Sequence, residues 1–258
     1  IFLSLKKYSV NQASREVYLK IIKRASILIL LGLFLNTFPG FDLLNIRVPG
    51  VLQRIGIVYG ISAILFLKTS LRTQAWISII ILVGYCFLLL ATPVPGTGNA
   101  SMTVESNWPA WLDYLLLKGH TWKDTWDPEG ILSTFPAVVT SQLGIFTAAF
   151  LFKNREDHSR ITWLMVSGNL MLFLALVWDL FFPINKALWT SSYVLYSAGL
   201  AAIAFMVLYW LVDVKGKINK KIFFPFIVLG VNPITAYMLS ILLAKVFSLI
   251  NISAGAET

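Results

Sequence analysis

The feature that most constrains the fold is a succession of long apolar windows. A helix needs about 20 apolar residues to cross the hydrocarbon core of a bilayer. Such windows lie at 21–38, 49–67, 74–92, 131–152, 161–182, 188–212 and 224–250. Only 13% of the 258 residues are charged, whereas soluble domains carry about 25%. The sequence therefore predicts an all-α, polytopic transmembrane helical bundle with about seven spans, forming a single domain over residues 1–258, and it excludes a soluble enzyme.

Connections rich and poor in lysine and arginine alternate along the chain, and this pattern predicts its orientation. The rich connections are 6–20, 68–72, 153–160 and 215–221, and the poor ones are 38–48, 93–129 and 183–187. In membrane proteins the positive charge concentrates in cytoplasmic loops. We therefore expect the poor connections and the C-terminal residue Thr258 to face outward. The net charge of +9 then belongs to the cytoplasmic loops, and no nucleic-acid partner is expected.

The outward loop 93–129 is the longest connection and is rich in aromatic residues. Residues Trp108 to Lys118 are predicted to form a short helix with an apolar face. Such a helix would lie along the membrane interface, where aromatic side chains are favoured. Two interpretations stay open: an ordinary aromatic belt, or a lid over an outward-facing site.

Arg54 lies about one turn inside the second window, directly after Gln53. A charge inside a bilayer costs roughly 2.5–3.5 kcal/mol on insertion scales, and it is tolerated mainly where it faces a bundle interior or a wet cavity. The alternative is that Arg54 snorkels to the headgroups, because it is close to the helix end.

The segment Asp127-Pro128-Glu129-Gly130 precedes the fourth window. Asp at the N-cap, Pro in the first position and a carboxylate in the first turn are typical of a helix start. The same two carboxylates could instead bind a polar acceptor or act as a base. His120, in the same loop, is either a general base or a solvated residue, and His158 is assigned no role.

Further polar residues lie beside the last three windows. Asn185, Lys186 and Trp189 stand at the outward ends of the fifth and sixth windows, where Asp179 could pair with Lys186. Asn232-Pro233 interrupts the seventh window. A proline there kinks the helix and frees a backbone carbonyl, either beside a cavity or only as a packing feature.

No phosphate-binding loop, His/Cys metal cluster, nucleophile elbow or dinucleotide fingerprint occurs in the sequence, and we expect no metal. The residues by themselves leave two classes of function open, an enzyme at the outer face or a transporter. A membrane scaffold without catalysis is a third.

Five stretches, in their order and spacing, resemble the heparan-α-glucosaminide N-acetyltransferase family and its bacterial acyltransferase relatives. They are Arg-Val-Pro-Gly-Val-Leu-Gln-Arg-Ile-Gly at 47–56, Pro-Val-Pro-Gly at 93–96, Asp-Pro-Glu-Gly-Ile-Leu at 127–132, Pro-Ile-Asn-Lys-Ala-Leu-Trp-Thr-Ser-Ser-Tyr-Val at 183–194 and Val-Asp-Val-Lys-Gly at 212–216.

The resemblance implies a multi-pass acetyltransferase of the bacterial inner membrane, and a homodimer. Such an enzyme passes an acetyl group from cytosolic acetyl-CoA to a glucosamine-type amino sugar on the periplasmic side. The family's catalytic histidine lies upstream of Ile1, so no catalytic residue is assigned here. The chain is expected to be a piece without the N-terminal helix region and the last helix of the family, and activity of the 258 residues alone is not expected.

The resemblance also suggests roles for the residues singled out above. Gln53 and Arg54 would line the core cavity, and Arg54 would bind a phosphate or carbonyl oxygen. Asp127 and Glu129 would hold the amino sugar at the outward mouth. The mouth would be closed by Asn185, Lys186 and Trp189. Asn232 would form hydrogen bonds within the cavity. A transporter or flippase for a sugar or glycolipid is the alternative, because it would share the charged core and the broken helix.

Overall fold

Every regular element in the described part of the chain is a helix. The computed structural model describes residues 1–258 apart from 9, 124, 153–156, 217–219 and 256–258. In chain order the elements are α1 (Phe2–Leu5), α2 (Arg15–Thr37), α3 (Val51–Lys68), α4 (Leu71–Ala91), α5 (Trp108–Leu117), α6 (Thr134–Leu151), α7 (Asp157–Asp179), α8 (Ser191–Tyr209) with a π-helical turn (Trp210–Val214), α9 (Lys220–Val231) and α10 (Pro233–Gly255). The all-α prediction is confirmed, and the short helix predicted at Trp108 to Lys118 is α5.

Short polar residues begin several helices at the ends of loops. The Ser70 side chain accepts a hydrogen bond from the Thr73 N–H at the start of α4, and Asn107 accepts one from the Ala110 N–H at the start of α5. Thr190 caps α8 in the same way. Each side chain satisfies one of the N–H groups that the first turn leaves unpaired. The local sequence therefore determines where these helices begin.

Six helices in the described part of the chain are long and apolar enough to cross a membrane. They are α3, α4, α6, α7 from His158, α8 with its π-helical turn, and α10 as far as Ile250. The window predicted at 21–38 lies in α2, which is not among the six because its first half carries Lys20, Lys23 and Arg24. The polytopic bundle is confirmed, with six such helices where seven windows were predicted.

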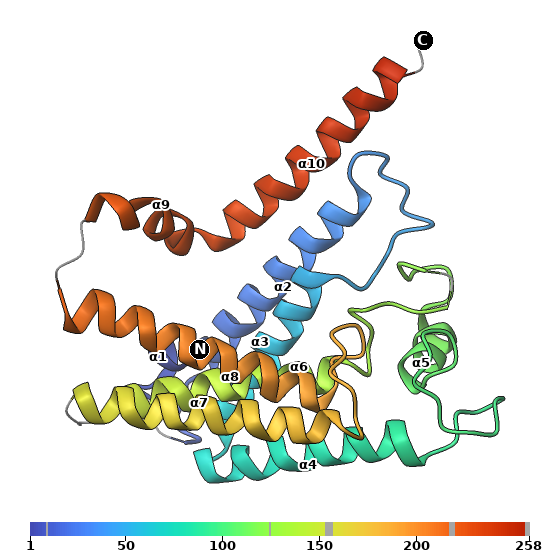
Figure 1. The fold of residues 1–258 in the computed structure, drawn as a ribbon. Helices are drawn as coiled ribbons and strands as arrows, with labels where there is room; N and C mark the ends of the chain where they lie inside the picture. Colours follow the sequence, from blue (N-terminus) through green and yellow to red (C-terminus); the bar gives the residue numbers. More distant parts are fainter. Residues whose placement is uncertain (9, 124, 153–156, 217–219, 256–258) are drawn as a thin grey trace.

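The last predicted window, 224–250, is divided between two helices. α9 ends at Val231 and α10 begins at Pro233, so Asn232 lies at the break. Proline has no N–H with which to continue a helix, and its ring clashes with the preceding turn. The interruption therefore falls where the sequence predicted it. Figure 1 shows that α10 runs beside α2 and stands clear of the α7–α8 pair.

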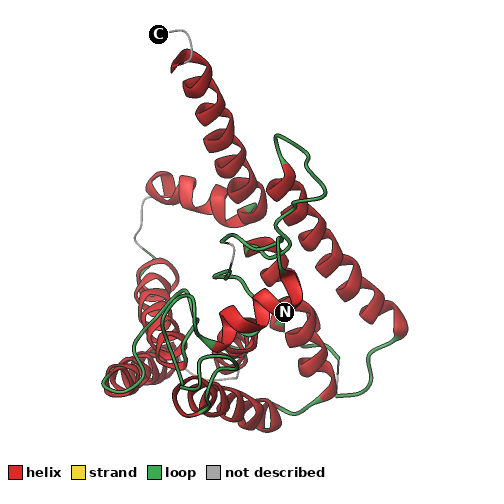
Figure 2. Ribbon diagram, turned by 90° about the vertical axis from the view of Figure 1, so that its right-hand side faces the viewer, coloured by secondary structure: helices red, strands yellow, loops and turns green. Residues whose placement is uncertain are grey.

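Two helix pairs and one central helix make the bundle. α7 packs along α8, α2 packs along α3, and α6 lies against α3, α4 and α8 (Figures 1 and 2). A Cβ on Gly199 would lie 2.8 Å from the Gly168 carbonyl oxygen, and a Cβ on Gly56 would lie 2.8 Å from the Ala25 carbonyl oxygen. Small residues let the backbones of membrane helices approach closely, so these glycines set the spacing within both pairs.

The connections poor in lysine and arginine meet at one end of the bundle. The Val48 N–H donates to the His120 carbonyl at 2.8 Å, and the Tyr85 hydroxyl donates to the Leu188 carbonyl at 2.6 Å. The indole of Trp108 also donates to the Thr92 carbonyl at 3.1 Å. The first bond joins the 38–48 and 93–129 connections, and the other two tie α5 and the loop before α8 to the C-terminal part of α4. These segments thus lie together, as expected for segments on one side of a membrane.

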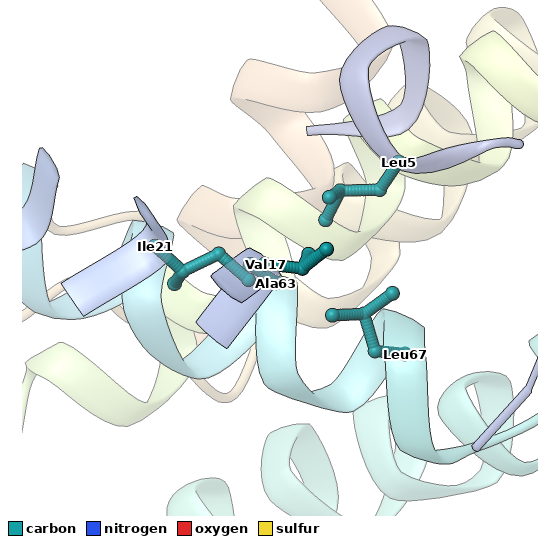
Figure 3. Close-up of a cluster of buried hydrophobic side chains, with 5 residues drawn as sticks. All are labelled: Leu5, Val17, Ile21, Ala63 and Leu67. Atoms are coloured by element: carbon teal, nitrogen blue, oxygen red, sulfur yellow. The ribbon is translucent and has the colours of Figure 1, made fainter. Parts of the chain in front are cut away.

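The described parts of the connections rich in lysine and arginine lie at the other helix ends. The Asn11 N–H donates to the Leu67 carbonyl at 2.8 Å, and Lys6 Nζ lies 4.3 Å from the centre of the Phe152 ring. Five buried side chains form an apolar cluster here, shown in Figure 3: Leu5, Val17, Ile21, Ala63 and Leu67. Four residues used to predict the orientation lie outside the described residues: Lys153, Arg155, Lys217 and Thr258. Which end faces the cytoplasm stays a prediction.

Candidate functional site

A charge cluster of Arg47, Asp127 and Glu129 is the centre of the candidate site. Arg47 Nε and Nη2 donate to the two carboxylate oxygens of Asp127, both at 2.7 Å, and Nη2 also donates to Glu129 Oε2 at 2.5 Å. The Asp127 side chain is fully buried, whereas 18% of the Glu129 side chain and 27% of the Arg47 side chain are exposed. Burial by itself lowers the pKa of Arg47, but the hydrogen bonds and charges of the two carboxylates outweigh burial and raise that pKa. A bidentate pair of this kind fixes both position and orientation.

Asp127 holds a turn and does not begin a helix. Its Oδ1 accepts from the Glu129 N–H at 2.9 Å, and its Oδ2 accepts from the Trp122 N–H at 2.8 Å. α6 begins only at Thr134, with Ser133 in the N-cap position. The interpretation of Asp127-Pro128-Glu129 as the first turn of the fourth span is therefore wrong. The carboxylate is committed to the Arg47 guanidinium, which binds it more strongly than uncharged N–H groups do.

Arg54 reaches the same turn from the first turns of α3. It is 5% exposed, and its Nη2 donates to the Pro128 carbonyl at 2.7 Å and to Ser133 Oγ. Its guanidinium carbon lies 4.9 Å from the centre of the Trp189 ring, within the range of a cation–π interaction. Arg54 Nε and Nη1 are buried and have no hydrogen-bond partner among the described residues. Arg54 thus faces the bundle interior, and the snorkelling alternative is not observed.

Trp189 belongs to the 183–190 loop, which brings it to Arg54. Its indole Nε1 donates to Thr140 Oγ1 on α6 at 3.2 Å. Asn185 shapes this loop, because its Oδ1 accepts from the Ala187 and Leu188 N–H groups at 2.8 and 3.2 Å. Of these two predicted site residues, Trp189 joins Arg54, whereas the Asn185 side chain serves the turn itself.

Lys186 is exposed, and the described residues show no ion pair between it and Asp179. The Asp179 carboxylate instead accepts from the Ile184 N–H at 2.6 Å. Asn232 is also exposed, at the break between α9 and α10, and it is not among the residues that contact Arg47 or Arg54. The roles suggested for Lys186 and Asn232 stay predictions.

His120 ties two connections together. Its ring Nδ1 lies 2.8 Å from the Ile46 carbonyl oxygen, and its own carbonyl accepts from the Val48 N–H at 2.8 Å. This pairing places the backbone next to Arg47. His158 is exposed near the start of α7.

Gln53 is buried and faces another side of α3 than Arg54, because adjacent residues of a helix point about 100° apart. It lines a cavity of about 370 Å³ between α2, α3 and α10, with Arg47 on the same wall. Its Nε2 is buried and has no hydrogen-bond partner among the described residues. The sequence prediction that Gln53 lines a cavity agrees with this position, while what the cavity binds stays a prediction.

Asp113, on α5, is a buried carboxylate for which the sequence reasoning proposed no role. Its Oδ1 accepts from the Ile131 N–H at 2.9 Å, and its Oδ2 has no hydrogen-bond partner among the described residues. A Cβ on Gly130 would come within 2.5 Å of Asp113 Cγ. Burial raises the pKa of Asp113 to about 6. The sequence feature that could have identified Asp113 is its position as an isolated acidic residue within the apolar segment Trp108–Leu117.

This arrangement can bind a polar molecule through oriented groups of both charges. Arg54 offers the N–H groups of two uncommitted nitrogens, Nε and Nη1, to an oxygen atom, and Glu129 has one carboxylate oxygen that does not bind Arg47. In the described part of the chain, no group of three or more His, Cys, Asp and Glu residues is placed to hold a metal ion. Fold and site together define a polytopic membrane protein with a charge cluster and a buried arginine at one end of its bundle.

Comparison with known proteins finds two similar N-acetyltransferases. The heparan-alpha-glucosaminide N-acetyltransferase of Homo sapiens is 29% identical over an alignment of 296 residues. The alignment covers 92% of this chain and 44% of that protein. The protein of the same name from Mus musculus is 28% identical with the same coverage. No family model matches the chain. The matches support the resemblance of the five motifs to the heparan-α-glucosaminide N-acetyltransferase family. The chain spans less than half the length of these two relatives.

Proposed function

We propose that this protein is a membrane-bound acyltransferase that passes an acetyl group from cytosolic acetyl-CoA to a glucosamine-type amino sugar on the periplasmic side of a bacterial inner membrane. The observation that carries the proposal is the similarity to two proteins named N-acetyltransferases, which extends over 92% of the chain. The charge cluster and Arg54 lie within the motifs that support this similarity. A homodimer stays a prediction from the resemblance.

Arg54 is the residue best suited to bind an oxygen atom of the donor. Its Nη2 is held by Pro128 and Ser133, so the guanidinium plane is fixed before a ligand arrives. Its Nε and Nη1 remain available in a buried position. Donors that are already oriented and shielded from water stabilise a developing oxyanion more than mobile donors do. Arg54 would therefore bind the thioester carbonyl, or a phosphate of acetyl-CoA.

The acceptor amine would bind at the charge cluster. An amino group must lose its proton before it attacks a thioester carbonyl. Both oxygens of Asp127 bind Arg47, and both also accept backbone N–H groups, so Asp127 serves to hold the cluster. Glu129 binds Arg47 through Oε2 and is partly exposed. The second oxygen of Glu129 would therefore bind the ammonium form of the acceptor.

The test measures free CoA and acetylated sugar on the two sides of a membrane. Inside-out vesicles that carry the full-length parent of this chain receive acetyl-CoA outside and glucosamine in the lumen. We expect free CoA outside and an equal amount of N-acetylglucosamine in the lumen. Glucosamine movement without CoA release would support the transporter alternative, which the break between α9 and α10 favours. If neither CoA release nor sugar movement is observed, both functions are rejected.

Arg54→Ala tests the proposed role of Arg54 in the same assay. Losing a charge-assisted hydrogen bond from an oxyanion site lowers the rate by roughly 100- to 1,000-fold. Arg72→Ala, which removes an exposed arginine from α4, is the control and should leave the rate unchanged. Equal acetyl-CoA affinity and turnover in Arg54→Ala and the unaltered protein would reject the role of Arg54.

A further inference from the structure

The cavity between α2, α3 and α10 has the lining of a binding site. Its volume is about 370 Å³, within the range of small-molecule pockets. Its polar and aromatic lining comes from three helices and two connections: Asn36, Arg47, Gln53, Trp122, Tyr237 and Lys245.

Gln53 is fitted into this cavity by two glycines. A Cβ on Gly32 would lie 2.5 Å from Gln53 Cδ, and a Cβ on Gly50 would lie 2.5 Å from Gln53 Oε1. Any larger residue at either position would therefore displace the amide. Gln53 is 5% exposed and its Nε2 has no hydrogen-bond partner among the described residues. A buried donor without a partner costs free energy, so its position in the cavity wall points to a ligand oxygen.

Lys245 places a positive charge in the opposite wall. Its Nζ donates to the Leu35 and Phe38 carbonyls at the C-terminal end of α2, at 2.6 and 2.7 Å. An ammonium group has three N–H donors, so one remains for a ligand. The two bonds also hold α10 against α2 and keep Lys245 in place.

Trp122 supplies an aromatic surface at the edge of the same cavity. It is 53% exposed, and its backbone N–H is held by Asp127 Oδ2. The apolar face of a sugar ring can cover such an indole, while the hydroxyl oxygens of the sugar accept from Gln53 and Lys245. Because Arg47 lines the cavity and also binds Glu129, a ring seated there can direct an amino substituent to Glu129.

We propose that this cavity binds the sugar ring of the acceptor, with Gln53 and Lys245 as donors to its hydroxyl oxygens and Trp122 against the ring face. The proposal rests on the proposed acetyl transfer for the identity of the sugar. α10 is then one wall of the site, although it lies at the margin of the bundle.

The test measures the kinetics of two variants and of one control variant. Gln53→Leu removes the donor from α3, and Lys245→Met removes the charge from α10. Loss of one hydrogen bond of this kind should raise the KM for glucosamine roughly tenfold. The kcat and the KM for acetyl-CoA should stay unchanged, because the donor site is not altered. Lys68→Met, at an exposed lysine at the end of α3, is the matched control for Lys245→Met.

Gly32→Ala tests the fitted position of Gln53 without changing its chemistry. It should raise the KM for glucosamine as Gln53→Leu does. Gly84→Ala is the control, because a Cβ on Gly84 of α4 would meet nothing within 4 Å. Should Gly32→Ala fail to fold, Lys245→Met still provides the test, since α10 makes few contacts with the bundle.

Sugar binding without acetyl-CoA separates this proposal from the proposed function. N-acetylglucosamine should raise the melting temperature of the purified protein, and Gln53→Leu and Lys245→Met should abolish the rise. If acetyl transfer occurs but these variants leave the glucosamine KM unchanged, the cavity proposal is overturned and the function stands. A second outcome is that no acetyl transfer occurs, but the rise in melting temperature with N-acetylglucosamine still depends on Gln53 and Lys245. In that case the cavity binds sugar and the proposed function fails.

Discussion

The charge cluster and the α9–α10 arm, residues 220–255, lie beside the same cavity but are held in opposite ways. Arg47 joins Asp127 and Glu129 through three charge-assisted bonds, and the Trp122 and Glu129 N–H groups complete the turn. α10 has no buried residue in its membrane-spanning stretch, and it touches α2 mainly through Lys245. Charge-assisted bonds among three side chains therefore hold one wall of the cavity, whereas two hydrogen bonds of Lys245 join the other wall to α2.

The largest effect is expected from Asp127→Ala. This change leaves the partly buried Arg47 guanidinium with Glu129 alone and frees the Trp122 N–H. Removing one partner of a buried ion pair costs about 3–5 kcal/mol of unfolding free energy. Denaturant titration in mixed micelles measures this loss. Asp42→Ala, which removes an exposed carboxylate that binds the Asn45 side chain, should change the unfolding free energy little. Similar losses in both variants would contradict the importance assigned to the cluster.

Gly130→Ala should be the next most damaging change. The new Cβ would come within 2.5 Å of Asp113 Cγ, and the Asp113 carboxylate is fully buried. Overpacking of this kind costs about 1–3 kcal/mol, and the absence of free space places this site at the upper end. Gly144→Ala on α6 is the control, because its Cβ would meet nothing within 4 Å. Equal melting temperatures for the two variants would show that α5 can move away from the turn.

Asp113 should make the stability of the protein depend on pH. Burial raises its pKa from 3.8 to about 6, so the fold favours the protonated form. This contribution is fully present below pH 3.8 and is lost as the pH rises through about 6. The shift corresponds to about 2–3 kcal/mol, at 1.36 kcal/mol for each pKa unit.

Asp113→Asn is the variant that checks this pH dependence. Its unfolding free energy should exceed that of the unaltered protein at pH 7.5 by about 2 kcal/mol, and the difference should vanish near pH 4. The two proteins differ only at position 113, so the difference between the two curves isolates Asp113. A difference that does not change with pH would contradict the raised pKa.

The smallest effect on global stability is expected from Lys245→Met. It removes two hydrogen bonds to the end of α2, on a helix that contributes little burial. The unfolding free energy should fall by only about 1 kcal/mol. Hydrogen exchange along α10 should nevertheless accelerate, while exchange in α3 and α6 stays the same. Unchanged exchange in α10 would show that contacts other than Lys245 hold the arm.

Much of the fold could be predicted because hydropathy is a local property. Six of the seven apolar windows correspond to helices able to span a membrane, and the break at Asn232-Pro233 follows from the missing N–H of proline. The remaining window, 21–38, also lies in a helix, but α2 carries Lys20, Lys23 and Arg24 in its N-terminal half and is not among the six. The start of the fourth span was also misplaced, because the same residue types that begin helices can form a turn that binds an arginine.

The sequence by itself determined the membrane-spanning composition, the approximate helices and the family motifs, because each depends on residues that are near one another in the chain. Only the tertiary structure decided that Arg47 binds a carboxylate 80 positions away, that Arg54 and Gln53 face different sides of α3, and that Asp113 is buried against Gly130. Desolvation and charge pairing depend on which helices become neighbours. The pattern of one segment does not contain that information.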